Sequence, residues 1–386
     1  MDKPGIYFDN AATSWPKPEK VYLAAEAYLR YGGTNPGRSG HTRSLQADRV
    51  VYDTREKAAS ILGASVPEEI VFTLNTTDSL NMAIKGFLEP GDHVIFTVFE
   101  HNSVLRPLGS LRRSNLITST MVQAGSSGDI LLDDIAQAIR PETRMIICNH
   151  ASNVTGQILP VEEIGQLAGE KGIVFLLDAA QTAGAIPLDL QKIKPHMAAF
   201  AGHKSLLGPP GVGLLYIRKD VKIKPWREGG TGSRSEEDQH PEFMPDYLEA
   251  GTMNAPGLAG LYEGLCFVEE QGVSNIRDHE MKLAGLLRRG LRAIPGVKVF
   301  GPEEESKSVA VVSFVVDGID SGEMGFVLEQ AFGILSRTGL HCAPNAHRAI
   351  GTFPQGTVRF SLGYFNTEVE VEQALKAVTE IAGRLV

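Results

Sequence analysis

From about residue 18, short β-rich runs alternate with helix-like segments, and this alternation constrains the fold more than any other feature. Four such runs are EIVFT at 69–73, HVIFT at 93–97, TRMIICN at 143–149 and IVFLLD at 173–178. Each precedes a turn and a stretch with apolar residues at helical spacing. Strands that alternate with helices predict βαβ crossovers and a mostly parallel sheet. IICN and VFLLD are apolar without alternation, which is typical of central strands covered on both faces.

The pattern changes after about residue 250. Two long helical stretches lead into VAVVSFVV, a helix-like GEMGFVLEQAFG, VRFSLGY and a last helix, which together predict a smaller α+β domain. We therefore predict a large domain at 15–265 and a small domain built from 1–14 and 266–386. The charged, glycine-rich stretch 228–245 is predicted to be a long loop beside a site.

Composition narrows the classes of function. The 386 residues carry a formal net charge of −9, and their 42% hydrophobic and 22% charged content is ordinary for a globular protein. Acidic and basic residues are mixed, which argues against the basic stripe of a nucleic-acid-binding protein. The sequence shows no signal-peptide pattern, no apolar run long enough for a membrane span and no disulfide framework. We expect a cytoplasmic protein without a membrane or nucleic-acid partner.

Two residues at neighbouring strand ends point to a cofactor. Asp178 ends the buried run IVFLLD, and Lys204 lies further along in FAGHKSLLGPPGVG. Alone, the aspartate would be a helix cap and the lysine a solvated surface group. Together they suit pyridoxal phosphate, which needs a lysine amine for its Schiff base and a carboxylate at its ring nitrogen. GHKS also resembles the end of a phosphate-binding loop, but the match is poor because His203 interrupts it.

Other strand ends add polar groups to the same crevice, because ligands of parallel sheets bind outside the carboxyl ends of the strands. Thr76 and Thr77 start a helix after EIVFT, where N–H groups and hydroxyls would meet a phosphate. His101 follows HVIFT and could stack on a pyridine ring and exchange protons. Asn153 follows TRMIICN and offers a donor to the ring hydroxyl. Each signal is weak alone; the set is specific.

Six ordered motifs carry a family resemblance: DNAAT at 9–13, EHNS, HASNVTG, LDAAQ, GHK and RTGLHC. From about residue 6 to the C-terminus the chain resembles the class V aminotransferase family of fold-type I pyridoxal phosphate enzymes. Within it, the chain is similar to group II cysteine desulfurases, which include selenocysteine lyases. The resemblance implies an α/β fold with a mostly parallel sheet and a smaller α+β domain, and a homodimer with shared active sites.

The resemblance also implies roles for single residues. Lys204 matches the lysine that bonds to the cofactor, Asp178 the partner of the ring nitrogen, and Arg359 the arginine that binds the substrate carboxylate. Cys342 matches the nucleophile that accepts sulfur. The other matches are Gln181 and Asn153 at the ring oxygen, Asn153 also beside the substrate, His101 stacked on the ring, Thr76, Thr77 and His203 at the phosphate, Thr252 reaching the phosphate from the second subunit, and Arg337 and His41 at further active-site positions. Ala201 departs from the family, where a hydroxyl is common, and predicts weaker cofactor retention.

The three cysteines are expected to differ. Cys148 and Cys266 lie in apolar runs and are predicted to be inert, because free cysteine is usually buried. Cys342 lies in a segment running to Phe353 that has little periodicity, and is predicted to sit in a loop. Its neighbours His341 and Arg337, as cations, would favour the thiolate.

The resulting hypothesis is a pyridoxal phosphate-dependent desulfurase. It would convert L-cysteine to L-alanine, with a persulfide on Cys342 for an unidentified acceptor protein and His101 as the proton donor or acceptor. Three alternatives remain: a selenocysteine lyase, another class V aminotransferase that leaves the thiol idle, and a non-catalytic sulfur-transfer partner. A metal enzyme is poorly supported, because neither H-E-x-x-H nor paired cysteine spacing occurs.

Overall fold

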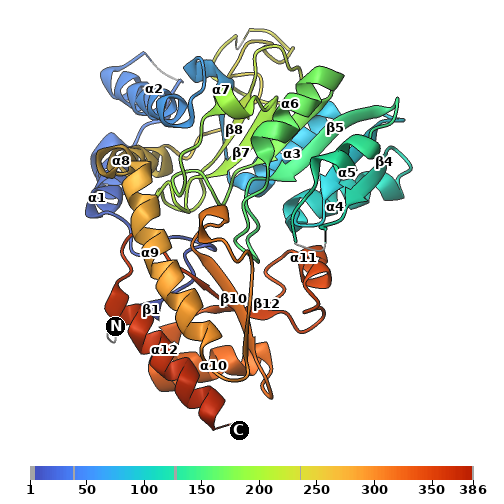
Figure 1. Cartoon of the computed structure of the whole chain (residues 1–386). Coiled ribbons are helices and arrows are strands. Elements are labelled where there is room, and N and C mark those ends of the chain that lie inside the picture. Colours follow the sequence, from blue (N-terminus) through green and yellow to red (C-terminus); the bar gives the residue numbers. More distant parts are fainter. Residues whose placement is uncertain (1–4, 38–39, 126–127, 235, 385–386) are drawn as a thin grey trace.

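The computed structural model describes residues 5–37, 40–125, 128–234 and 236–384, and is built around a seven-stranded sheet (Figure 1). The strand order is β2-β8-β7-β6-β5-β3-β4. The strands span β2 Ile70–Thr73, β3 His93–Thr97, β4 Thr118–Val122, β5 Thr143–Asn149, β6 Val174–Asp178, β7 Met197–Ala201 and β8 Gly213–Ile217. From β4 through β7 every neighbouring pair is parallel, whereas β8 runs antiparallel to both β7 and β2. The predicted mostly parallel sheet is confirmed.

The central strands are apolar throughout because both of their faces are covered. Ile146 and Leu177 pack into the core on one face of the sheet, and their chain neighbours Ile147 and Leu176 pack into the core on the other. All four side chains are at most 1% exposed. Burial of each contributes about 1.5–3 kcal/mol to stability. The uninterrupted runs of the sequence are thus explained by helices on both sides of the sheet.

The helices of this part follow the predicted segments and have recognisable ends. His41 caps the long helix α2, its ring nitrogen accepting from the Ser44 N–H at 3.1 Å, and Gly63 ends it with φ 76°. The helices span α1 Glu19–Ala27, which continues as a π-helix over Tyr28–Gly32, α2 Thr42–Leu62, α3 Thr76–Phe87, α4 Asn102–Arg113, α5 Leu132–Gln137, α6 Val161–Lys171, α7 Leu190–Ile193 and α8 Ala255–Gln271, with a 3-10 turn at Pro67–Glu69.

A second, antiparallel sheet lies in the C-terminal part, in the order β12-β13-β10-β9. Helices α9 and α12 lie side by side and share an apolar core with this sheet (Figure 1). The elements here are α9 Val273–Arg292, β9 Val297–Phe300, a 3-10 turn at Glu305–Lys307, β10 Val311–Val316, α10 Ser321–Phe332, β11 Ile334–Leu335, β12 Arg337–Gly339, α11 Pro344–Ala349, β13 Thr357–Ser361 and α12 Glu368–Gly383. The N-terminal strand β1, Ile6–Tyr7, pairs in parallel with β11.

The predicted division of the chain at 265/266 stays a prediction, and α8 runs across it without a break. The loop predicted at 228–245 is irregular as expected in its described residues. In this single chain it lines a cavity with Asp48 and Tyr52, separate from the cavity at the strand ends. Within the described ranges, every helix is too short or too polar to cross a bilayer.

Candidate functional site

A cavity of about 200 Å3 lies at the carboxyl ends of the large sheet. Most of the residues singled out from the sequence line this one cavity, although they are far apart in the chain. They are Thr76, Thr77, His101, Asn153, Asp178, Gln181, His203, Lys204, Arg337 and Arg359, joined by Ala11, Ala12, Asn75, Ser103, Asn149, Ala151 and Ala180. The sheet's topology therefore brings the predicted residues together.

Lys204 lies just after β7 and supplies the amine of the cavity. Burial, and after it the nearby cations of Arg359 and Arg337, lower the pKa of its ammonium to about 8. The Asp178 carboxylate opposes this shift. A lysine poised near neutral pH can lose its proton and act as a nucleophile or base.

Asp178 is the last residue of β6 and supplies the carboxylate. Burial raises the pKa of this carboxyl group, while the Ala180 N–H, which donates to it at 3.0 Å, and the Lys204 cation act in the opposite direction. Only 7% of the residue is exposed. A carboxylate held this deeply needs a cationic partner, and the cavity provides a place for one.

The N-terminus of α3 forms one end of the cavity. Asn75 caps this helix, its side-chain oxygen accepting from the Asp78 N–H at 3.0 Å. The hydroxyl of Thr77 lies 2.7 Å from that of Ser103, at the start of α4. Since the first N–H groups of a helix have no partner within it, this end of the cavity suits an anion such as a phosphate.

His101 caps α4 and faces the cavity as a neutral ring. Its Nδ1 accepts from the Ser103 N–H at 3.1 Å, which assigns the proton of the neutral ring to Nε2. Burial, with Lys204 next in effect, lowers its pKa to about 4. At neutral pH His101 is therefore a hydrogen-bond donor through Nε2–H and not a cation.

Arg359 on β13 brings a fully buried guanidinium to the cavity. It pairs with Asp9 at 2.7 Å and donates to the backbone oxygen of Asn153 at 3.1 Å, while its Nε has no partner among the described residues. The side chain of Asn153 donates in turn to the carbonyl of His341 at 2.7 Å. The guanidinium thus ties the two sheets together and retains an unsatisfied donor, which suits a carboxylate ligand.

Cys342 lies in the turn between β12 and α11, beside the cavity. Both His341 and Cys342 adopt left-handed backbone conformations, with φ of 46° and 59°, at a cost of about 1–2 kcal/mol for each. The turn is held against the large sheet because the Asn102 N–H donates to the Cys342 carbonyl at 2.7 Å. Arg337, which lines the cavity, reaches the Cys342 sulfur with Nη2 at 3.3 Å.

Two expectations about this segment are wrong. The stretch after Cys342 is not all loop, since α11 occupies Pro344–Ala349. His341 is not a cation beside the sulfur, because its ring is buried and its Nε2 lies 2.9 Å from the Thr357 hydroxyl. Burial and nearby cations lower the pKa of this ring to about 2. Of the two predicted cations, only Arg337 contacts the thiol.

Other predicted positions lie outside the cavity in this chain. Thr252 is exposed and lines a different cavity beside β2, and His41 is exposed at the start of α2. Their suggested roles stay predictions. Cys148 is fully buried, and burial raises the pKa of its thiol well above the ordinary value. Cys266 is half-buried on α8, where burial also raises its thiol pKa.

Sequence reasoning missed several residues of this region. Asn75 and Ser103 line the cavity. Both could have been found from the sequence, because Asn75 adjoins Thr76 and Ser103 lies two residues after His101. Asp9 lies in DNAAT, and the sequence holds no signal that pairs it with Arg359. Glu100 is fully buried against Thr97 and the Asn149 N–H, and burial raises its pKa to about 8.

The fold and the strand-end cavity together define an α/β protein of the fold-type I kind, and the chain belongs to the class V aminotransferase family. The family described as Aminotransferase class-V matches residues 6–374. Among curated relatives, a probable cysteine desulfurase of Methanothermobacter thermautotrophicus is 33% identical over 98% of this chain and 95% of its own. A probable cysteine desulfurase of Pyrococcus abyssi is 34% identical, over 98% and 95%.

Solved structures agree with this placement. The apo structure of a cysteine desulfurase from Thermococcus onnurineus superposes with a TM-score of 0.91 at 33% identity, covering 99% of this chain and 95% of the other. The cysteine desulfurase CsdA from Escherichia coli superposes with a TM-score of 0.90 at 28% identity, covering 100% and 96%. The expected fold is thereby confirmed.

Proposed function

We propose that this protein is a pyridoxal phosphate-dependent cysteine desulfurase that converts L-cysteine to L-alanine and leaves a persulfide on Cys342. The observation that carries the proposal is the position of Arg337, which lines the cavity of Lys204 and Asp178 and also contacts the Cys342 sulfur. The similarity to cysteine desulfurases over nearly the whole chain supports it.

The residues around the cavity fit the proposed cofactor. Lys204 would hold it covalently and Asp178 would keep its ring nitrogen protonated. The N-terminus of α3 would hold its phosphate, where the first N–H groups of the helix lack partners. His203 adds a buried Nδ1 that has no partner among the described residues. When bound, pyridoxal phosphate withdraws electrons from the substrate's Cα and makes its proton acidic.

Arg359 would bind and orient the substrate. Its guanidinium is buried and charged, and the contacts to Asp9 and Asn153 hold its plane in one orientation. A carboxylate that pairs with it would be fixed with two hydrogen bonds. A neutral group in place of the carboxylate would lose the charge-assisted part of these hydrogen bonds and would bind less well.

Proton transfer is assigned to Lys204 and His101. With its pKa lowered to about 8, Lys204 can take the proton from the substrate's Cα and return it at the end of the reaction. His101 presents Nε2–H to the cavity and can donate a hydrogen bond to the substrate. Since its pKa is lowered to about 4, the ring works in its neutral form at neutral pH.

Cys342 would receive the sulfur. Its thiolate attacks the substrate sulfur, a new S–S bond forms, and the substrate's Cβ–Sγ bond breaks with its electron pair moving to carbon. Protonation of that carbon gives alanine, so one L-cysteine and one thiol become one L-alanine and one persulfide. Arg337 would stabilise the attacking thiolate through its contact at 3.3 Å.

We further propose a cytoplasmic homodimer and a separate sulfur acceptor protein. Large apolar side chains are exposed on one group of neighbouring helices: Tyr22 and Leu23 on α1, Leu29 and Tyr31 on the π-helix, and Leu45 and Tyr52 on α2. Such a concentration suits a protein interface. Thr252 is exposed and away from this chain's cavity, as expected of a residue that reaches the site of a second subunit.

The test is to measure alanine and released chalcogen from L-cysteine and L-selenocysteine side by side. The proposal expects equal amounts of alanine and sulfane sulfur from L-cysteine, with no pyruvate. Activity on L-selenocysteine alone would make the protein a selenocysteine lyase. Pyruvate formed from L-alanine and a keto acid would make it an aminotransferase. A purified protein that never binds the yellow cofactor would reject all three.

A further inference from the structure

The N-terminal segment from Asp9 to Lys17, here called the strap, contacts several groups of the proposed site. Its first residue pairs with Arg359 at 2.7 Å. The Ala11 N–H donates to the Ser361 hydroxyl at 2.9 Å, and the Ala11 carbonyl accepts from Gln181 at 3.1 Å. The strap thus joins the C-terminal sheet to the cavity of the large sheet.

The other end of the strap converges on a single carbonyl oxygen, that of His203. Four donors lie within 3.2 Å of this oxygen: the Ser14 N–H at 3.1 Å, the Thr13 hydroxyl at 3.1 Å, the Ser14 hydroxyl at 3.2 Å and the Lys17 ammonium at 3.1 Å. This oxygen belongs to the peptide bond that joins His203 to Lys204. The strap therefore holds the backbone from which the Lys204 side chain extends.

Lys17 is unusual because its ammonium donates hydrogen bonds to groups of the protein. Lysine side chains are normally solvated, whereas Lys17 is half-buried and donates to the Ser14 hydroxyl at 2.8 Å as well as to His203. Burial lowers its pKa to about 8. No carboxylate among the described residues pairs with this ammonium, so the Ser14 hydroxyl and the His203 carbonyl are the acceptors that offset its desolvation.

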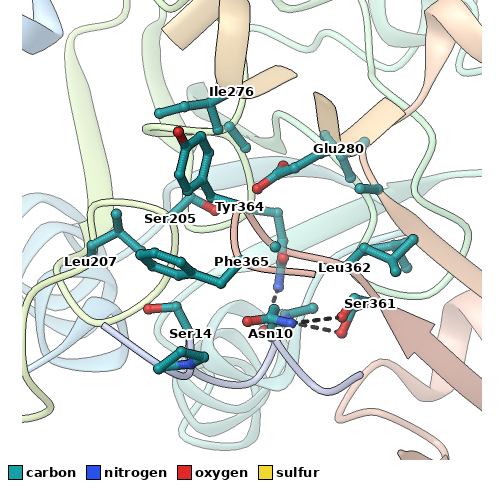
Figure 2. Close-up of a pocket in the computed structure, with 18 residues that line it drawn as sticks. Asn10, Ser14, Ser205, Leu207, Ile276, Glu280, Ser361, Leu362, Tyr364 and Phe365 are labelled. Atoms are coloured by element: carbon teal, nitrogen blue, oxygen red, sulfur yellow. Dashed lines mark hydrogen bonds between the residues drawn. The ribbon is translucent and has the colours of Figure 1, made fainter. Parts of the chain in front are cut away.

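Packing alone does not fix the strap. Figure 2 shows Asn10 and Ser14 on one side of a second cavity, with Glu280 and Tyr364 on the other side. This cavity has a volume of about 30 Å3, which is room for ordered water. The strap also has the first cavity at Ala11 on its other side, so polar contacts add to the position that the packing of Ala11 and Trp15 gives it.

We propose that Lys17 is a positioning residue for the reaction: it anchors the strap to the His203–Lys204 peptide and so sets where Lys204 stands relative to Arg359. The inference rests on the proposed roles of Lys204 and Arg359. Displacement of a reacting group by about 1 Å can cost a hundredfold in rate, so loss of the anchor would act on the chemical steps. The Asp9 contact at the far end stays in place, so binding of the substrate carboxylate would change little.

The experiment compares Lys17→Met with the exposed control Lys20→Met and with Lys17→Arg, which restores a cationic donor. In Lys17→Met we expect kcat for alanine formation to fall about tenfold to a hundredfold while KM for L-cysteine stays within about twofold. The rate at which apoprotein and added pyridoxal phosphate regain the yellow absorbance should fall with kcat. Lys20→Met should match the wild type, and Lys17→Arg should recover part of kcat.

A second variant, Thr13→Val, keeps the test decisive if the Lys17→Met protein fails to fold. It removes one donor to the His203 carbonyl and keeps the Lys17 cation. It should lower kcat a few-fold at an unchanged melting temperature. A Lys17→Met protein with wild-type kcat and cofactor uptake would overturn the inference. So would a fall in kcat in Lys17→Met if Lys17→Arg recovered none of the activity and Thr13→Val kept the wild-type kcat. Lys204→Ala separates the two claims, because retained absorbance in that variant would reject the proposed role of Lys204 itself.

Discussion

Two cavities lie on opposite sides of Ala11 and Gln181, and each contains a deeply buried carboxyl group. Asp178 in the first is 7% exposed and Glu280 in the second is 6% exposed. Asp178 accepts from the Ala180 N–H and faces the Lys204 cation. Glu280 has no hydrogen-bond partner in the part of the chain that the structure describes, and only the Arg277 charge opposes its desolvation.

The difference shows that burial of an acid does not by itself mark a functional site. Burial raises the pKa of both carboxyl groups, and that of Glu280 reaches about 8, so Glu280 is neutral at neutral pH. What distinguishes Asp178 is the amine in the same cavity, together with the helix N-terminus and Arg359 around it. The proposed chemistry depends on that combination of charges, whereas no lysine or arginine lines the second cavity among the described residues.

The largest expected effect comes from two matched substitutions, one in each cavity, that replace the buried carboxyl group by an amide of the same shape. Asp178→Asn should lower alanine formation by at least about a hundredfold, because the ring nitrogen of the cofactor loses its anionic partner. Glu280→Gln, at equal burial, should keep near wild-type activity. Steady-state rates and the cofactor absorbance spectrum of both proteins measure this. Equal losses in the two variants would remove the distinction between the cavities.

A smaller effect concerns the cation that links the first cavity to the thiol. Arg337→Gln removes the donor at 3.3 Å from the Cys342 sulfur and should slow alkylation of this cysteine by iodoacetamide at pH 7 about tenfold. The half-buried Cys266 is the internal control, since its surroundings are unchanged. Labelling of Cys342 at the wild-type rate would show that Arg337 does not activate the thiol.

The smallest effect is on stability and concerns the second cavity. The pKa of Glu280 is raised from 4.5 to about 8. The contribution of the protonated Glu280 to the free energy of unfolding is therefore fully present below pH 4.5 and is lost as the pH rises through about 8. Glu280→Gln should therefore raise the free energy of unfolding by about 1–3 kcal/mol at pH 8 and change it little at pH 5. Denaturant unfolding at both pH values tests this. A gain of equal size at both would rule out titration of Glu280.

Much of the fold and most of the cavity could be predicted from the sequence, for one physical reason. Parallel strands expose their carboxyl ends at one edge, so Thr76, His101, Asn153, Asp178 and Lys204 had to meet once the strands were recognised. The periodic pattern of the strands and of the long helices is strong because both faces of the sheet are buried.

The rest depends on contacts that local sequence does not encode. Helix α11 spans only Pro344–Ala349, too short for a period to show. The neutrality of His341 arises from burial and from Thr357, on another strand. The strap's hold on the peptide of Lys204 joins residues about 190 positions apart, and Thr13 and Lys17 carry no local sign of it.

The central claim is tested most directly by locating the sulfur after a single turnover. The protein loaded with pyridoxal phosphate is mixed with one equivalent of L-cysteine without reductant, digested, and its three cysteine-containing peptides are weighed by mass spectrometry. We expect the Cys342 peptide alone to gain one sulfur atom, in an amount equal to the alanine formed. Sulfur on the peptide of Cys148 or Cys266, or alanine formed with no sulfur on any of the three, would contradict the account.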